Sequence, residues 1–211
     1  GHGVPGAMVS LIGTRALNSA VRESGATKPS DVLDIVNEMM IESFTDSEDN
    51  GIIKDGMDIS LCALDYSDKK SVQFQYAGAQ NSVWIVRAES EENISVNGKI
   101  IEPNIISSGH KLFEIKADKQ PIGYFEGRVP FKNKECNLKI GDRIYLYSDG
   151  FADQFGGEKG KKFKYKTLKE LILSVQHKPV NEQYNDIRTA FYDWKREFEQ
   201  IDDVCFMGVE V

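Results

Sequence analysis

The stretch Tyr147-Ser148-Asp149-Gly150-Phe151 places a carboxylate at the end of a predicted strand. Residues 143–148 (RIYLYS) combine strong strand formers with an alternation of bulky and polar side chains, and this pattern stops at Asp149-Gly150. A strand that ends in Asp-Gly presents an acidic side chain at the rim of a sheet, and the glycine allows the backbone to turn or to approach another group closely.

A second acidic pair, Asp202-Asp203, precedes the last apolar alternation of the chain, residues 204–211. Carboxylates at strand ends are suitable ligands for hard cations such as Mg²⁺ and Mn²⁺. Turn chemistry offers a simpler interpretation, because Asp-Gly and Asp-Asp are also common in turns that bind nothing. Taken singly, the two acidic pairs leave both interpretations open.

The hydrophobic periodicity of the chain predicts an α+β fold. Helical spacing covers two early and two late segments, and the first of them has an apolar stripe made of Val4, Met8, Leu11, Ile12, Ala16 and Leu17. Asn97-Gly98 is a strong hairpin signal, and residues 45–55 form a predicted polar loop. The predicted helices cover residues 4–21, from about 30 onward, 167–176 and 182–200, and the predicted strands cover residues 57–64, 72–77, 83–87, 111–116, 132–138, 143–148 and 204–211.

Composition narrows the class of protein. With 211 residues, 40% of them hydrophobic, the chain is long enough for one sizeable core, and we expect a single domain over residues 1–211. The formal net charge of −7 argues against general nucleic-acid binding. No apolar run approaches the roughly 20 residues that span a bilayer, so no membrane contact is expected. Three widely separated cysteines (Cys62, Cys136, Cys205) indicate buried free thiols and a cytoplasmic location.

Several motifs, in their order and at their separations, are similar to those of a known family. They are Gly1-His2-Gly3-Val4-Pro5-Gly6-Ala7, Tyr76-Ala77-Gly78-Ala79, Gln120-Pro121-Ile122-Gly123, YSDGFADQFGG at residues 147–157, and Ile201-Asp202-Asp203-Val204. Together they resemble the metal-dependent serine/threonine phosphatase domain of the bacterial sporulation-phosphatase type. This branch of the PP2C-like superfamily includes the phosphatases that regulate sigma factors, and the resemblance covers essentially the whole chain.

The resemblance implies an αββα sandwich, in which two antiparallel sheets pack together and helices cover their outer faces. The family carries an aspartate three residues before the first glycine, where it bridges two metal ions. Because the sequence begins at Gly1, we expect it to be the C-terminal part of a larger sensor protein, without that aspartate and the N-terminal strand or strands. The piece itself is then expected to bind metal weakly and to be slow or inactive, and the parent protein could be anchored in a membrane.

The resemblance also implies a set of site residues. Asp149 and Asp202 match the family's remaining metal-ligand positions, and the adjacent Asp203 is a further candidate. The implied centre holds two Mn²⁺ or Mg²⁺ ions, which activate water and neutralise the charge of a phosphate. His2 stands beside the position of the missing aspartate, and we predict that it has an outer-sphere or proton-handling role in catalysis. A structural or exposed histidine is the alternative.

Lysines are concentrated between residues 159 and 166 of this otherwise acidic chain. We predict that Lys161, Lys162 and Lys164 form a docking surface for a phosphorylated or acidic partner. The alternative is a solvated loop before a helix.

The leading hypothesis is a protein phosphatase in which metal-activated water attacks phosphoserine or phosphothreonine directly. By resemblance, the favoured substrate is a phosphorylated anti-anti-sigma factor in bacterial signalling, and a dimer is a possible assembly. The alternative is a non-catalytic pseudophosphatase that binds its partner without turnover. A nucleotide-binding protein is disfavoured, because Gly156-Gly157 fits neither the Walker nor the dinucleotide spacing.

Overall fold

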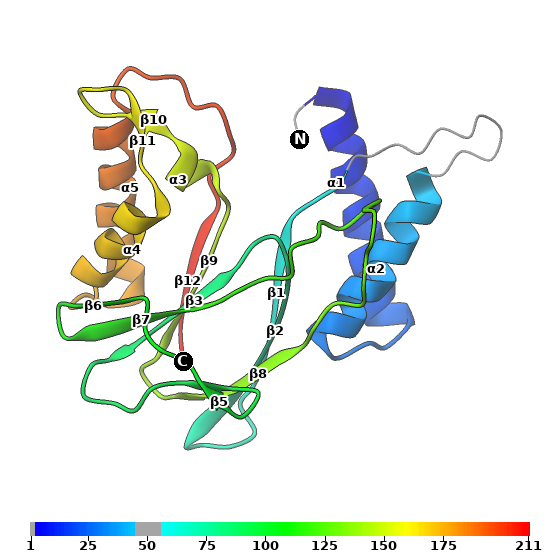
Figure 1. The fold of residues 1–211 in the computed structure, drawn as a ribbon, viewed down its shortest axis with the longest axis horizontal. Helices are drawn as coiled ribbons and strands as arrows, with labels where there is room; N and C mark the ends of the chain where they lie inside the picture. The colour runs from blue at the N-terminus through cyan, green and yellow to red at the C-terminus, as the bar shows by residue number, and fades with distance from the viewer. Residues whose placement is uncertain (1–2, 45–55) are drawn as a thin grey trace. The chain divides into compact units, whose positions relative to one another are not determined.

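The computed structural model describes residues 3–44 and 56–211 (Figure 1). His2 and the predicted loop at residues 45–55 lie outside these ranges. The chain divides into two compact units, each with its own core. Unit 1 comprises Gly1–Ser67, Gln73–Ser82 and Lys116–Cys136, and unit 2 comprises Asp68–Val72, Val83–Ile115 and Asn137–Val211.

Unit 1 combines an antiparallel strand pair with helices. Its sheet has the strand order β1-β2-β8, and β1 pairs with β2 from Ile59↔Ala79 to Asp65↔Gln73. The elements are α1 (Gly3–Asn18), the π-helical turn η1 (Ser19–Glu23), α2 (Pro29–Phe44), β1 (Ile59–Asp65), residues 73–79 of β2 (Ser71–Ala79) and residues 134–136 of β8 (Lys134–Lys139).

The predicted apolar stripe of α1 is confirmed only in part. Val9 and Ala16 are buried in the core of unit 1, whereas Met8 and Leu11 are 50% and 74% exposed. Gly13 shares the buried face, and a Cβ there would come within 2.9 Å of a methionine sulfur. The predicted members Ile12 and Leu17 pack partly buried against the same core, so the stripe is wrong at Met8 and Leu11, and periodicity alone does not show which side of a broad apolar surface is buried.

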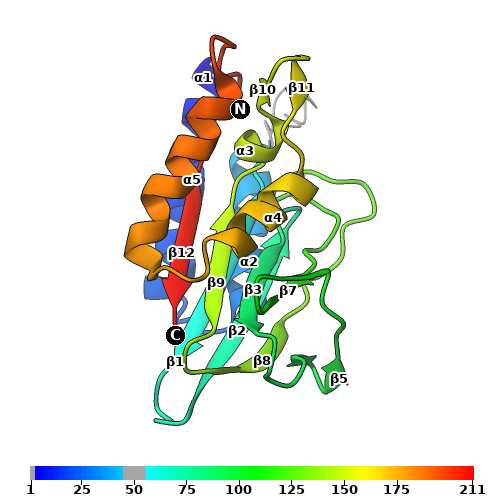
Figure 2. The ribbon, with the colours of Figure 1, turned by 90° about the vertical axis from the view of Figure 1, so that its left-hand side faces the viewer.

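Unit 2 contains an antiparallel sheet with the strand order β12-β9-β3-β7-β6. Helices α4 and α5 cover one face of this sheet (Figure 2). The core between them joins Trp84 and Tyr145 of the sheet to Leu168 of α4 and Phe191 of α5. The elements are β3 (Val83–Ala88), β4 (Ser95–Val96), β5 (Lys99–Ile100), β6 (Ile105–Ser107), β7 (His110–Ile115), residues 137–139 of β8, β9 (Arg143–Tyr147), α3 (Gly150–Asp153), β10 (Phe155–Gly156), β11 (Lys161–Lys162), α4 (Tyr165–Ser174), α5 (Val180–Lys195) and β12 (Phe206–Glu210).

A buried ion pair ties β3 to the residue before β9. Arg87 Nη2 lies 2.6 Å from Asp142 Oδ2, and the two side chains are 4% and 3% exposed. Arg87 also donates to the carbonyl oxygens of Glu92 and Asn137, at 3.2 and 3.4 Å. The Lys139 N–H donates to the Asp142 carboxylate at 2.8 Å. These bonds compensate both buried charges, as an ion pair in a protein interior requires.

Several predicted boundaries change in the structure. The hairpin at Asn97-Gly98 is confirmed, because φ values of 48° and 77° give the left-handed turn that β4 and β5 need. The last predicted helix is too long: α5 ends at Lys195, and Arg196 has a φ of 49°. The short elements α3, β6, β10 and β11 were not predicted, because two to four residues are too few to show a periodicity.

The cysteines are free, but they do not share one environment. Cys136 is buried, as predicted. Burial raises the pKa of the Cys62 thiol to about 12, so the Cys62 thiol is protonated at neutral pH. Cys205 is exposed, so the prediction of a buried thiol is wrong there. The reason is that β12 begins only at Phe206 and leaves Cys205 on the surface segment before it.

The predicted α+β class is confirmed, since antiparallel sheets and separate helices make up both units. Over residues 3–44 and 56–211, no helix is both long enough and apolar enough to cross a membrane.

Candidate metal centre

Asp149 lies where β9 ends and α3 begins. The next residue, Gly150, is buried, and a Cβ there would lie only 2.5 Å from the carbonyl oxygen of Asp203. Glycine is therefore needed at this position for a reason beyond the turn itself. It allows the segment that carries Asp202 and Asp203 to run directly beside Asp149.

Hydrogen bonds hold that acidic segment in place. The Ser148 hydroxyl donates to the Asp203 carbonyl oxygen at 2.8 Å and accepts the Cys205 N–H at 2.9 Å. The Asp203 N–H donates to the Asp202 carboxylate at 2.8 Å. The side-chain amide of Gln200 donates to the Asp202 carbonyl oxygen at 2.9 Å. The backbone around Asp202 is thus fixed from both sides.

Asp149 and Asp202, far apart in sequence, lie close enough for one to change the pKa of the other. Partial burial raises the pKa of the Asp149 carboxyl, and the negative charges of Asp202 and Asp153 raise it further. A hydrogen bond with the Asp202 side chain also favours the protonated form of Asp149. The structure therefore brings these two predicted site residues together, with negative charge that a cation would offset.

This donor set fits a divalent cation. Mg²⁺ is commonly held by one or two carboxylates, with water completing its coordination, and Mn²⁺ also prefers oxygen ligands. Asp203 makes the contacts described above through its backbone, and its exposed side chain stays a predicted ligand. In the described part of the chain, no group of three or more His, Cys, Asp or Glu side chains is arranged to hold a metal ion. His2 stays a prediction, because it lies outside the described residues.

The predicted docking lysines lie on the β10–β11 hairpin and just after it. Lys162 Nζ is 2.9 Å from Asp153 Oδ2, a carboxylate four residues after Asp149. Lys161 lines a pocket of about 550 Å³ together with Trp194 of α5. Lys164 precedes α4 and has a φ of 75°, an uncommon backbone conformation for a residue with a side chain. The hairpin therefore carries positive charge beside Asp153, whose own charge acts on Asp149.

The hairpin is anchored to the end of α5 and to the loop that follows it. A Cβ at Gly156 would lie 2.0 Å from the Trp194 carbonyl oxygen, which accepts the Gly157 N–H at 2.8 Å. The Trp194 ring N–H donates to the Gln154 carbonyl oxygen at 3.0 Å. The side-chain amide of Gln154 donates to the Glu199 carbonyl oxygen at 3.0 Å. Sequence reasoning missed Gln154, because nothing in the local pattern shows that it is buried between these segments.

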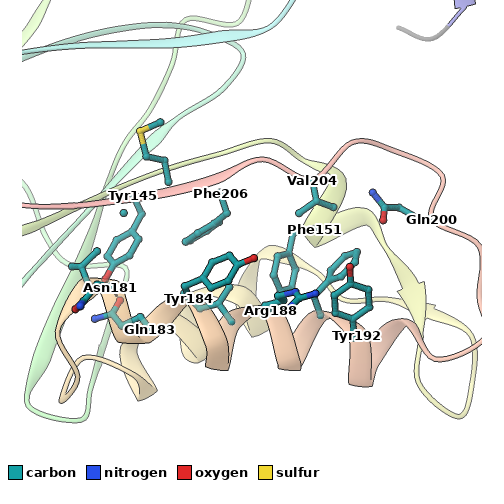
Figure 3. Close-up of a pocket in the computed structure, with 15 residues that line it drawn as sticks. Tyr145, Phe151, Asn181, Gln183, Tyr184, Arg188, Tyr192, Gln200, Val204 and Phe206 are labelled. Atoms are coloured by element: carbon teal, nitrogen blue, oxygen red, sulfur yellow. Dashed lines mark hydrogen bonds between the residues drawn. The ribbon is translucent and has the colours of Figure 1, made fainter.

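A pocket of about 590 Å³ lies between α5 and β12 (Figure 3). Tyr184, Arg188 and Tyr192 line it from α5, and Phe206 lines it from β12. One end reaches Val204, close in sequence to the acidic segment. Helical periodicity identifies the aromatic face of α5, but it does not show that Tyr184 stays 63% exposed.

The whole chain, residues 1–211, matches the family model described as stage II sporulation protein E (SpoIIE). Among solved structures, the SiaA-PP2C domain of Pseudomonas aeruginosa is similar over 100% of this chain and 72% of that chain, with 24% identity and a TM-score of 0.77. A structure of the RsbU and RsbW domains of a Mycobacterium tuberculosis protein is similar over 100% of this chain and 50% of that chain, with 17% identity and a TM-score of 0.63.

The phosphatase domain of the cell-fate determinant SpoIIE from Bacillus subtilis, presoaked with manganese, is similar over 94% of this chain and 71% of that chain. Its identity to this chain is 16% and its TM-score is 0.50. At identities this low, the three structures show that the fold is alike and nothing further about this chain. A search of curated proteins gave no match.

Proposed function

Because the chain belongs to the stage II sporulation protein E family, we propose that it is a phosphoprotein phosphatase that acts on phosphoserine or phosphothreonine in a regulatory protein. The observation that carries this proposal is the juxtaposition of Asp149 and Asp202 in a chain that matches the family over its whole length. The likeness to the fold of the SiaA-PP2C domain supports the same class of protein.

In this proposal, Asp149 and Asp202 hold Mn²⁺ or Mg²⁺ in a two-metal centre. Bound ions of this kind supply activation of water and neutralise the charge on phosphoryl oxygens. The contribution of the chain is to keep two like-charged carboxylates side by side, which Gly150 allows and which the bonds around Asp203 enforce. Partial burial and, after it, the neighbouring negative charges raise the pKa of Asp149, and a cation offsets the repulsion between these charges, so the arrangement favours metal binding.

The proposed substrate is a phosphorylated anti-anti-sigma factor in the bacterial cytoplasm. Support comes from the family and from the likeness to a structure that contains RsbU and RsbW domains. Lys161, Lys162 and Lys164 would receive the acidic surface of such a partner, since Lys162 lies beside Asp153, four residues after Asp149.

A pseudophosphatase is the second candidate. One observation favours it: in residues 3–44 and 56–211, the acidic centre is a pair of carboxylates rather than a larger ligand group. Such a protein would bind its phosphorylated partner without hydrolysing the phosphate.

Turnover separates the two candidates. We expect the intact protein to release phosphate from a phosphoserine protein and from 4-nitrophenyl phosphate when Mn²⁺ is present. Chelation with EDTA should stop this release, and renewed Mn²⁺ should restore it, because the proposed chemistry depends on the ion. Binding of the phosphoprotein with no phosphate release at any Mn²⁺ concentration would favour the pseudophosphatase.

The docking surface can be tested separately from the chemistry. Replacing both Lys161 and Lys164 with Gln is expected to raise KM for the phosphoprotein about threefold at low salt, because fewer positive charges attract an acidic partner. The kcat for 4-nitrophenyl phosphate should not change, since this small ester needs no protein surface. Lys99→Gln, an exposed lysine of β5, is the matched control. Equal KM values in all three proteins would contradict the docking role.

A further inference from the structure

We infer that Ser148 is a positioning residue of the proposed centre, and that its hydroxyl holds the acidic segment so that Asp202 stays beside Asp149. The inference rests on the proposed function, because it takes these two carboxylates to be metal ligands. Ser148 itself touches neither carboxylate in the contacts that the structure shows; it acts on the backbone that carries Asp202.

The first argument comes from the strand ladder. Strand β12 pairs with β9 from Glu210↔Arg143 to Phe206↔Tyr147. One step further, the Ser148 N–H donates to the Cys205 carbonyl oxygen at 2.9 Å, as a continued ladder would. In a regular antiparallel pair, the return bond would run from the Cys205 N–H to a backbone carbonyl. It runs instead to the Ser148 hydroxyl oxygen, at 2.9 Å.

The second argument comes from the proton of the same hydroxyl. It is donated to the Asp203 carbonyl oxygen at 2.8 Å. The Ser148 side chain therefore accepts a hydrogen bond from the Cys205 N–H and donates one to the carbonyl oxygen of Asp203, two residues earlier. With these two bonds, the acidic segment leaves the regular β9–β12 pairing at Cys205, three residues after Asp202. The Asp203 carbonyl is thereby held at the site that Gly150 leaves open.

The third argument is electrostatic. The segment that carries Asp149 runs directly against the segment that carries Asp202, and like-charged carboxylates on two such segments repel each other. A pair of this kind stays together only if other bonds hold the segments that carry it. Ser148 precedes Asp149 directly and bonds the residue after Asp202, so it links the two segments that carry the carboxylates.

The side-chain chemistry makes the inference specific. A hydroxyl on a short stem can accept and donate at once; threonine offers the same group, alanine offers neither function, and a thiol is a weak substitute. Ser148 is only partly buried, which leaves room for the threonine methyl group. Loss of the hydroxyl should therefore loosen the acidic segment without disturbing the core of unit 2.

The test compares Ser148→Ala, Ser148→Cys and Ser148→Thr with the wild-type protein by calorimetric Mn²⁺ titration and by amide hydrogen exchange in the presence of EDTA. We expect Ser148→Ala to weaken Mn²⁺ binding about tenfold, as loss of an outer-sphere partner commonly does. The Cys205 amide should exchange faster in the same variant, and Ser148→Thr should restore both properties. Ser174→Ala, which removes an exposed hydroxyl bonded to the Leu171 carbonyl oxygen in α4, should change neither.

Wild-type Mn²⁺ affinity in a folded Ser148→Ala protein would overturn the inference, and so would unchanged protection of the Cys205 amide. If Ser148→Ala does not fold, Ser148→Cys carries the same comparison, because it keeps the shape and weakens the hydrogen bonds. Absence of Mn²⁺ binding by the intact wild-type protein would overturn the proposed function. Faster exchange at Cys205 in Ser148→Ala would then still show that the hydroxyl holds the segment, so the two failures are distinguishable.

Discussion

An Asp149→Asn variant of the intact protein is expected to lose more than about 100-fold of its Mn²⁺-dependent turnover of a phosphoserine protein, since even an outer-sphere partner of a metal ligand is worth about 10–100-fold. Asparagine keeps the volume and one oxygen, but it removes the negative charge that a divalent cation requires. Steady-state phosphate release at saturating Mn²⁺ measures the effect. Asp186→Asn, at a carboxylate paired with Lys178 and remote in sequence from the acidic centre, is the matched control.

The same substitution should not unfold the chain. Because the pKa of Asp149 is raised in the folded protein, its charged form is disfavoured there, and this cost applies at any pH above the raised pKa. Without metal, Asp149→Asn should therefore unfold at the wild-type temperature or slightly above it at pH 7. The difference should shrink as the pH falls through the raised pKa, and it should vanish below the ordinary carboxyl pKa, where Asp149 is neutral in both the folded and the unfolded protein. Equal turnover in Asp149→Asn and wild type would reject metal catalysis at this site.

The largest stability effect is expected from Asp142→Ala. This change leaves the Arg87 guanidinium buried without its counter-ion, and breaking a buried pair in this way costs about 3–5 kcal/mol. In a protein of this size, such a cost corresponds to a fall of roughly 10 °C in Tm. Thermal unfolding followed by circular dichroism measures it.

Two further variants show whether the effect depends on burial. Glu91→Ala breaks the exposed pair with Lys139, and it should cost no more than about 1 kcal/mol. Replacing Arg87 with Met and Asp142 with Leu together should recover most of the stability lost in Asp142→Ala, because no charge then remains unpaired in the core. A loss in Glu91→Ala as large as that in Asp142→Ala would contradict the role given to burial.

Local chemistry made much of the fold predictable. The turn at Asn97-Gly98 depends on two adjacent residues that tolerate left-handed backbone, and the end of β9 depends on the change from strand formers to Asp-Gly. The packing of α1 was not predictable in this way. Which side of its broad apolar surface is buried depends on how α1 packs against α2, and that packing is a property of the whole unit.

The candidate site was likewise predictable only in part. Asp149 and Asp202 could be selected from the sequence, because carboxylates beside strand ends form a local pattern that the family motifs strengthen. The contacts that bring them together could not, because they are long-range. Gly150 meets the Asp203 carbonyl oxygen, and Ser148 bonds the same residue, only after β9 and β12 have paired.

The chain has two tryptophans, Trp84 and Trp194, and both belong to unit 2. Trp84 is fully buried beside Tyr147, with ring centroids 4.0 Å apart, whereas Trp194 lines the pocket next to the lysine hairpin. Intrinsic tryptophan emission therefore comes from unit 2 alone and does not report directly on the unfolding of unit 1. A melting curve recorded by emission follows the core around Trp84 and the hairpin around Trp194, and the loss of α1 and α2 in unit 1 is visible only in far-ultraviolet ellipticity.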